Sequence, residues 1–149
     1  MTHFCSFPRR SLFAACVASL VLAGCAAPRA SLSPEADKAE LQKRAQAYWD
    51  LSRANDNVAA WAYEAASKDG STTLQSYIQR GGITYDAVEV RGVRSLDGDE
   101  AVLDVWMRFS IPLLRMKGQE AVAPDYWRRI GGVWHHVLHK SSALPDAKP

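Results

Sequence analysis

Residues 126–138 read YWRRIGGVWHHVL, and this stretch decides how the C-terminal part of the chain folds. Gly131 and Gly132 separate two runs of large side chains, a spacing that favours a two-residue turn between antiparallel strands. A two-residue turn also fixes the register. The residues expected to lie opposite one another are Ile130 and Val133, Arg129 and Trp134, Arg128 and His135, Trp127 and His136, and Tyr126 and Val137.

Three histidines, His135, His136 and His139, follow the turn. Side chains alternate along a strand, so His136 points away from the other two, which lie about 13 Å apart on one face at roughly 3.3 Å per residue. Zinc requires ligand nitrogens about 2 Å from the ion. The sequence therefore predicts no metal site here. We expect His136 and His139 at the surface and His135 on the apolar face of the sheet.

Two further glycine turns precede this hairpin, at Asp97-Gly98 and Lys117-Gly118, so the sequence predicts a four-stranded antiparallel meander. Pro112 should break or bend the second strand because proline cannot donate a hydrogen bond to a neighbouring strand. The first turn pairs Gly92 with Leu103, Val90 with Val105, Val88 with Met107, Arg91 with Asp104, Glu89 with Trp106, and Ala87 with Arg108. The second pairs Phe109 with Tyr126, Met107 with Arg128, Val105 with Ile130, Trp106 with Arg129, and Arg108 with Trp127.

This register sorts the sheet into two faces. The inner face is apolar and holds no Asp or Glu: Val88, Val90, Leu103, Val105, Met107, Phe109, Tyr126, Ile130, Val133 and Val137. The outer face brings together three tryptophans and two arginines: Trp106, Arg108, Trp127, Arg129 and Trp134. Clustered Trp and Arg side chains are typical of binding interfaces. We expect the outer face to form a homodimer or to dock another protein, or else to cover itself with arginines lying on tryptophan rings.

Helices are expected before the sheet. Ser33-Pro34-Glu35 is a typical helix start. The residues that follow at helical spacing are Leu41, Ala45, Tyr48, Trp49 and Ser52. A second helix is expected from a cap at Asn55 or Asp56 to Asp69-Gly70, and a third from Ser71 to Gly81-Gly82. The sequence thus predicts an α+β fold, with N-terminal helices packed on a curved sheet of four or more antiparallel strands.

The first 24 residues have the layout of a signal peptide, with Arg9 and Arg10 before the apolar run SLFAACVASLVL. That run is too short to span a bilayer, which takes roughly 20 residues. Leu22-Ala23-Gly24-Cys25 resembles the lipobox of bacterial lipoproteins, which implies lipid on Cys25; the alternative is an ordinary signal peptide. Residues 25–33 then form the lipidated cysteine and a tether, 34–140 the domain and 141–149 a flexible tail. Because Ala26 is not an Asp retention signal, the resemblance implies the outer membrane, facing the periplasm.

Processing at Cys25 changes both the cysteine content and the charge. Cys5 and Cys16 are removed with the leader, which leaves no thiol for a disulfide. Loss of Arg9 and Arg10 leaves 16 basic and 16 acidic residues, a formal net charge of zero. The composition therefore gives no support to nucleic acid as a partner.

The helical stretch LQKRAQAYWDLSRANDNVAAWAYEAAS, followed by a meander that ends in YWRRIGGVWHHVL, resembles the nuclear transport factor 2-like superfamily over roughly Ala36 to Lys140. That group includes ketosteroid isomerase, scytalone dehydratase and the SnoaL-like polyketide cyclases. The resemblance implies a cone, in which a curved sheet wraps a long helix and leaves a cavity open at one end. Isomerases of this fold use a carboxylate base and a Tyr donor inside the cone, whereas the inner face predicted here has no carboxylate.

Two functions follow. The first is a membrane-anchored lipoprotein whose domain binds a small apolar ligand or a protein without catalysis, and without a cofactor or metal. The alternative is a small isomerase or dehydratase, with His135 as the base and Tyr126 and Arg128 as donors. In either case the expected pocket residues are Tyr126, Arg128, His135, Met107 and Tyr48.

Overall fold

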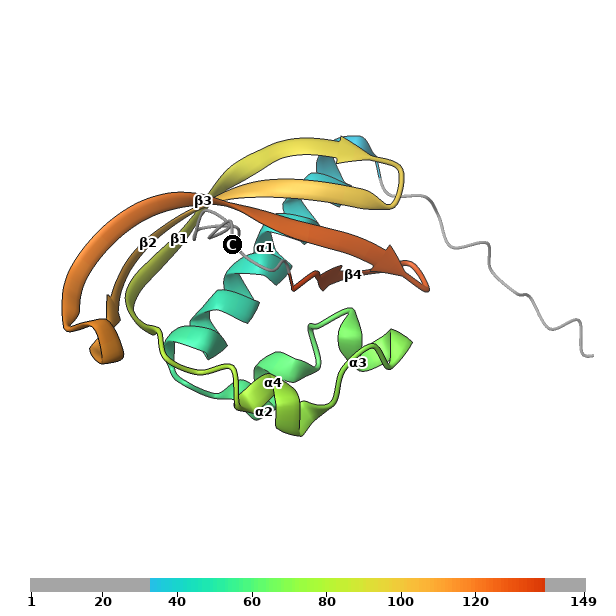
Figure 1. The fold of residues 1–149 in the computed structure, drawn as a ribbon. Helices are drawn as coiled ribbons and strands as arrows, with labels where there is room; N and C mark the ends of the chain where they lie inside the picture. Colours follow the sequence, from blue (N-terminus) through green and yellow to red (C-terminus); the bar gives the residue numbers. More distant parts are fainter. Residues whose placement is uncertain (1–32, 139–149) are drawn as a thin grey trace, which may run out of the picture. The chain divides into compact units, whose positions relative to one another are not determined.

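The computed structural model describes residues 33–138, so Cys25, His139 and the predicted tail lie outside the described residues. The described residues all belong to one compact unit. The described core lies wholly within that unit. Within it, helices come first and a four-stranded antiparallel sheet follows (Figure 1).

Helix α1 spans Pro34–Arg53 and begins as the sequence predicts. The Ser33 hydroxyl accepts a hydrogen bond from the Ala36 amide at 3.3 Å, and acidic side chains in the first turn favour the positive end of the helix dipole. The predicted apolar stripe is confirmed: the buried side chains include Leu41, Ala45, Tyr48 and Trp49.

Three short helices follow, where the sequence predicted two: α2 (Asn57–Trp61), α3 (Ala66–Asp69) and α4 (Leu74–Ile78). Asp56 caps α2, and Gly70 ends α3 in a left-handed conformation. The predicted second helix is interrupted because residues 63–65 instead pair with the sheet. The cap of α4 is Thr73 and not Ser71.

The sheet contains β1 (Thr84–Asp97), β2 (Glu100–Ile111), β3 (Met116–Ile130) and β4 (Val133–His136), in that spatial order. It curves around α1 (Figure 1), and the core between them contains Leu41, Ala45, Leu103, Val105 and Trp127. The predicted α+β fold, with N-terminal helices packed on a curved antiparallel sheet, is therefore confirmed.

The first hairpin has the predicted register only in part. Val88 pairs with Met107, and Val90 with Val105, as expected. The turn itself lies one residue later, since Asp97 pairs with Glu100. Register irregularities between Val90 and Gly92 and between Val93 and Ser95 absorb the difference. The predicted pairs Gly92–Leu103 and Arg91–Asp104 are wrong, because Leu103 lies opposite Val93 and Asp104 opposite Gly92.

The second hairpin is offset from the predicted register by seven residues. Met107 pairs with Ala121, and the predicted partner was Arg128. The chain turns earlier than expected because Pro112 ends β2 and begins the 3-10 turn η1 (Pro112–Leu114). Gly118 has a left-handed φ of 60° inside β3, at an irregularity in the pairing. An odd offset exchanges the faces of a strand, so the predicted faces of β3 and β4 are inverted.

The third hairpin is confirmed. Ile130–Val133, Arg129–Trp134, Arg128–His135 and Trp127–His136 are the observed pairs, and the Val137 amide donates to the Tyr126 carbonyl at 2.7 Å.

Both outer strands of the sheet have partners beyond it. On β1, the Val90 amide donates to the Gln46 side-chain oxygen at 2.9 Å, and the Gln46 amide donates to the Val88 carbonyl at 3.4 Å. On β4, the His136 amide donates to the Tyr63 carbonyl and the Ala65 amide donates to the His136 carbonyl, both at 2.8 Å. The second set of bonds draws Glu64 against the end of the sheet.

Candidate functional site: a buried histidine between two carboxylates

The inverted faces of β3 and β4 bring an unexpected set of ionisable side chains into the core. Asp125 on β3 is 4 % exposed, His136 on β4 is 8 % exposed, and Glu64, in the segment that pairs with β4, is fully buried. Ions this deep are retained only when they are paired and hydrogen-bonded. Their mutual contacts therefore decide what the site can do.

The His136 ring lies between the two carboxylates. Its Nδ1 is 3.0 Å from both Oε1 and Oε2 of Glu64, and its Nε2 is 3.0 Å from Oδ1 of Asp125. Carboxylates only accept hydrogen bonds, so both ring nitrogens carry protons in this arrangement. The site holds an imidazolium with an anion at each nitrogen.

Side chains from α1 and β3 donate further hydrogen bonds to the oxygens of the two carboxylates. The Tyr48 hydroxyl donates to Oε1 of Glu64 at 2.8 Å. The indole N–H groups of Trp49 and Trp127 both donate to Oδ2 of Asp125, at 3.0 and 2.7 Å. The Tyr48 ring also stacks on the imidazole, with centroids 4.4 Å apart and planes 21° from parallel. We call Tyr48, Trp49, Glu64, Asp125, Trp127 and His136 the buried ion cluster.

The surroundings fix the protonation states. Burial alone would lower the pKa of His136, but hydrogen bonds and charge from Asp125 and Glu64 outweigh it and raise the pKa to about 9. Burial, and after it the charge of Glu64, raises the pKa of Tyr48 well above its ordinary value. At neutral pH the imidazolium is therefore charged and the phenol is neutral.

The expected surface position of His136 is thus wrong, and the expected lack of a carboxylate on the inner face is wrong because Asp125 lies there. The prediction missed Glu64, Asp125 and His136 together. The alternation Asp125-Tyr126-Trp127 could have indicated the site, because it puts the acid on the same face as a large tryptophan. The wrong register of the second hairpin instead placed both side chains on the outer face.

The predicted pocket residues are divided between the core and the surface. Arg128 and His135 are cross-strand neighbours as expected, but Arg128 is half-exposed and pairs with Asp69 of α3 at 2.8 Å. Tyr48 belongs to the buried ion cluster, whereas the strand alternation puts Tyr126 on the opposite face from Trp127. Met107 is half-buried against the core.

His135 is enclosed rather than open to a pocket. It is 4 % exposed, and its Nδ1 has no hydrogen-bond partner among the described residues. Burial, followed by the charges of Arg44 and Lys68, lowers the pKa of His135. It is therefore neutral at pH 7, but little exposed to a substrate.

The predicted outer-face interface also needs correction. Trp127 and Trp134 are 1 % and 2 % exposed, so both are core residues. Arg129 does lie over Trp134, 4.3 Å from the ring centroid, as expected. Trp106 remains on the other face and is half-buried; the arginine above it is Arg91, at 5.9 Å, and not Arg129.

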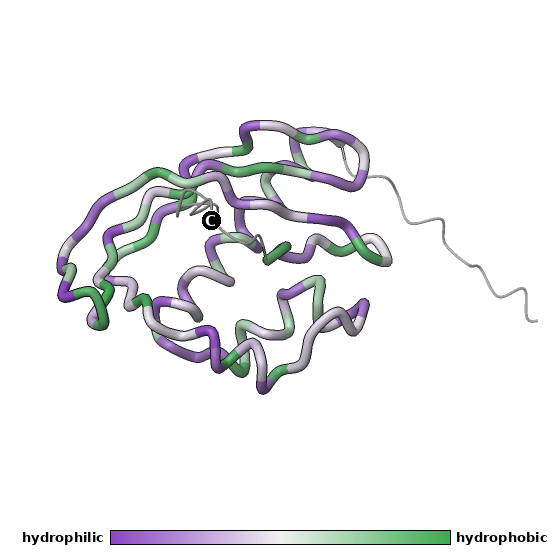
Figure 2. Tube along the Cα trace, in the orientation of Figure 1, coloured by the Kyte–Doolittle hydropathy of each residue, from purple (hydrophilic) through white to green (hydrophobic). Residues whose placement is uncertain are grey.

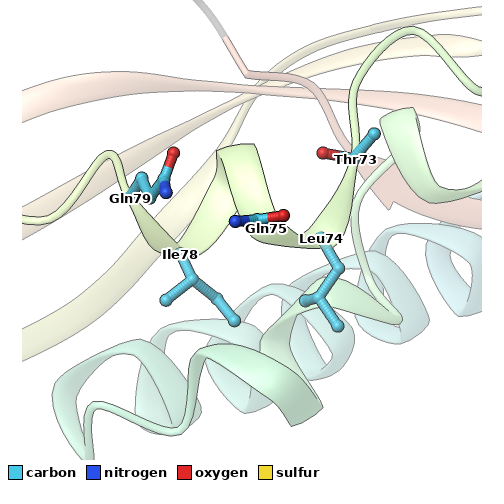
Figure 3. A pocket seen from close by; sticks show the side chains of 5 residues that line it. All are labelled: Thr73, Leu74, Gln75, Ile78 and Gln79. Atoms are coloured by element: carbon cyan, nitrogen blue, oxygen red, sulfur yellow. The ribbon is translucent and has the colours of Figure 1, made fainter.

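Two hollows on the surface of the described unit lie away from the buried ion cluster. The first has a volume of about 570 Å³ and is lined by residues of and around α4: Thr73, Leu74, Gln75, Ile78 and Gln79. Figure 3 shows Leu74 and Ile78 pointing to the same side of this helix. The second hollow lies beside η1 and is lined by Ser110, Pro112, Arg115, Met116 and Lys117. Neither contains a predicted pocket residue.

Within residues 33–138, no group of three or more His, Cys, Asp or Glu side chains is arranged to hold a metal ion. No helix among the same residues is long and apolar enough to cross a membrane.

Comparison with solved structures finds a low level of similarity. A Campylobacter jejuni protein described as an NTF2-like transpeptidase, with a crystal structure at 2.00 Å, matches with a TM-score of 0.45 and 10 % identity, over 66 % of this chain and 98 % of that chain. No family model and no curated protein matches the sequence. A likeness at this level carries no argument about activity, and the fold rests on the helices and strands themselves.

Proposed function

We propose that this chain is a lipoprotein held to the cell envelope by lipid on Cys25, with a cone-shaped domain that binds a ligand or protein partner without catalysis. The position proposed is the outer membrane, facing the periplasm. Support for the anchor comes from the sequence LAGC and from the position of the folded unit, which follows that motif closely.

The observation that carries the non-catalytic proposal is the saturation of the buried ion cluster. Both nitrogens of His136 face carboxylates. Tyr48 also donates to Oε1 of Glu64, and the indoles of Trp49 and Trp127 donate to Oδ2 of Asp125. A general base must reach the proton that it removes, within about 3.2 Å or through one water. The groups with suitable chemistry instead bind one another, which favours a structural role.

The alternative enzyme would use His135 with Tyr126 and Arg128. This alternative has less support, because His135 is 4 % exposed and Arg128 already pairs with Asp69. Neither described hollow contains these residues.

The non-catalytic proposal predicts slow solvent exchange at the His136 ring. Both N–H protons should give downfield proton NMR resonances at pH 7, because each is hydrogen-bonded to a buried carboxylate. Their exchange with water should require opening of the domain and should slow as stability rises. A His136→Gln variant assigns the two signals. Rapid exchange in a fully folded protein would show that solvent reaches the ring directly, and would contradict the saturation of the buried ion cluster on which the non-catalytic proposal depends.

The anchor makes a separate prediction about Cys25. Cys25→Ser should remove the thiol that receives lipid, so the variant should incorporate no labelled palmitate and should keep its leader. Cys16→Ser is the matched control and should be labelled like the wild type, because that residue lies within the leader. Equal labelling of wild type and Cys25→Ser would contradict the anchor and leave the proposal for the folded domain intact.

A further inference from the structure

The turn between β2 and β3 exposes three large apolar side chains. Leu113 is 89 % exposed, Leu114 62 % and Met116 38 %. We call these three residues the apolar tip. Leaving large apolar side chains in water is unfavourable, at about 25 cal/mol per Å² of apolar surface, and a contiguous group of them marks an interaction site more often than isolated ones do.

The apolar tip lies at the end of a projecting hairpin. Residues 116–122 of β3 are all exposed, and burial begins only further along the strand. Figure 1 shows the ends of β2 and β3 curving to the far left, and Figure 2 shows hydrophobic colour at that end. Pro112 begins the turn, and Arg115 takes a left-handed φ of 54° where the chain reverses. The apolar tip therefore lies where the chain reverses, at the exposed end of this hairpin.

The charge around the apolar tip is positive. Residues 105–119 contain three basic residues, Arg108, Arg115 and Lys117, and no acidic one. The nearest acids in the pairing are Glu120, opposite Arg108, and Asp86, which accepts a hydrogen bond from Ser110 at 3.3 Å. Arg115 and Lys117 line the same surface hollow as Met116, so this end of the hairpin offers both apolar area and cations.

We propose that the apolar tip inserts into the interfacial layer of a bilayer with anionic headgroups, with Arg115 and Lys117 binding those headgroups. Apolar side chains among basic ones are what binds shallowly to such membranes, and each cation near an anionic surface adds to the attraction. Leu113 and Leu114 are exposed enough to enter the apolar layer, while the long side chains of Arg115 and Lys117 can stay at the level of the headgroups. The contact is non-covalent and independent of lipid on Cys25, so it would act as a second membrane contact beside the proposed anchor.

The test uses residues 26–149 without lipid, which contain the compact unit, and co-sedimentation with equimolar phosphatidylcholine and phosphatidylglycerol vesicles. Wild type should sediment with them. Leu113→Ser/Leu114→Ser should reduce the partition coefficient by about tenfold or more, because two side chains no longer enter the apolar layer. Val58→Ser/Ile78→Ser removes two other exposed apolar side chains, 63 % and 42 % exposed, and should sediment like wild type.

A second arm tests the charges. Arg115→Gln/Lys117→Gln should weaken binding to the anionic vesicles by about tenfold, and binding to pure phosphatidylcholine vesicles should be equal for both proteins. Circular dichroism verifies that each variant is folded. Absence of wild-type sedimentation, or equal sedimentation of the leucine variant, would overturn the proposal. Self-association that depends on the leucines, measured by sedimentation velocity without vesicles, would instead assign the apolar tip to a protein contact and also overturn it. None of these outcomes depends on the Cys25 labelling experiment.

Discussion

Replacing His136 with alanine is expected to lower the free energy of unfolding by about 3–5 kcal/mol, because it removes the one cation that separates two buried carboxylates. Glu64 and Asp125 would then each face a gap left by the ring. Folded domains are stable by only about 5–15 kcal/mol, so this loss is a large part of the total. Urea denaturation followed by tryptophan fluorescence measures it.

His135→Ala is the matched control. The neighbouring ring is also buried, at 4 % exposure, but it has no carboxylate at either nitrogen among the described contacts. Its loss should cost about 1–2 kcal/mol, the ordinary range for a substitution that removes packing alone. If His136→Ala and His135→Ala lose equal stability, the ion pairs contribute nothing beyond packing and the account of the buried ion cluster is wrong. Should His136→Ala fail to fold, His136→Gln provides a milder version of the same comparison.

Stability should also fall as the pH rises from 6.5 to about 9. The pKa of His136 is about 9 in the folded protein, and an unfolded histidine titrates near 6.5. The folded state therefore retains a proton that the unfolded state releases between these values. The resulting contribution to stability, about 3 kcal/mol, is fully present below pH 6.5 and disappears as the pH passes through 9.

Urea denaturation at several pH values between 6 and 9 tests this slope. The difference between wild type and His136→Ala isolates the one residue, because other titrating groups are common to both proteins. That difference should be largest at the acidic end of the range and should shrink towards pH 9. A difference that is constant with pH would mean that His136 titrates alike in the folded and unfolded states.

The sequence predicted the elements of this fold better than it predicted their register. Ser33-Pro34 marked the start of α1 because capping depends on a few adjacent residues, and Gly131-Gly132 gave the last hairpin correctly because its strand partners adjoin the turn. Gly118 was wrongly predicted to form a turn, because a glycine with left-handed φ occurs at irregularities within strands as well as in turns. Pro112, expected to break or bend the second strand, ends that strand and also begins the reversal of the chain.

The prediction missed the buried ion cluster because the register of the second hairpin was wrong. If the predicted register had been wrong by an even number of residues, the prediction would still have placed Trp127 and Asp125 on the inner face. The error was seven residues, so the prediction placed them on the outer face. The contacts that create the site are also long-range: Glu64 meets His136 across 72 residues, and Trp49 meets Asp125 across 76. Periodicity within one element carries no information about such contacts. It did identify correctly that His135 and His136 point in opposite directions.

The partners on the two outer strands bear on whether this protein can form fibrils. A strand with unpaired backbone groups at the edge of a sheet is a template for addition of further chains. Here the Gln46 side chain occupies the backbone groups of Val88 and Val90, much as a peptide group would, and the residues around Glu64 occupy those of His136. Addition of a foreign strand at either place must first displace a native partner. One amide side chain and one short loop segment thus protect these two stretches of the sheet's edge from pairing with another chain.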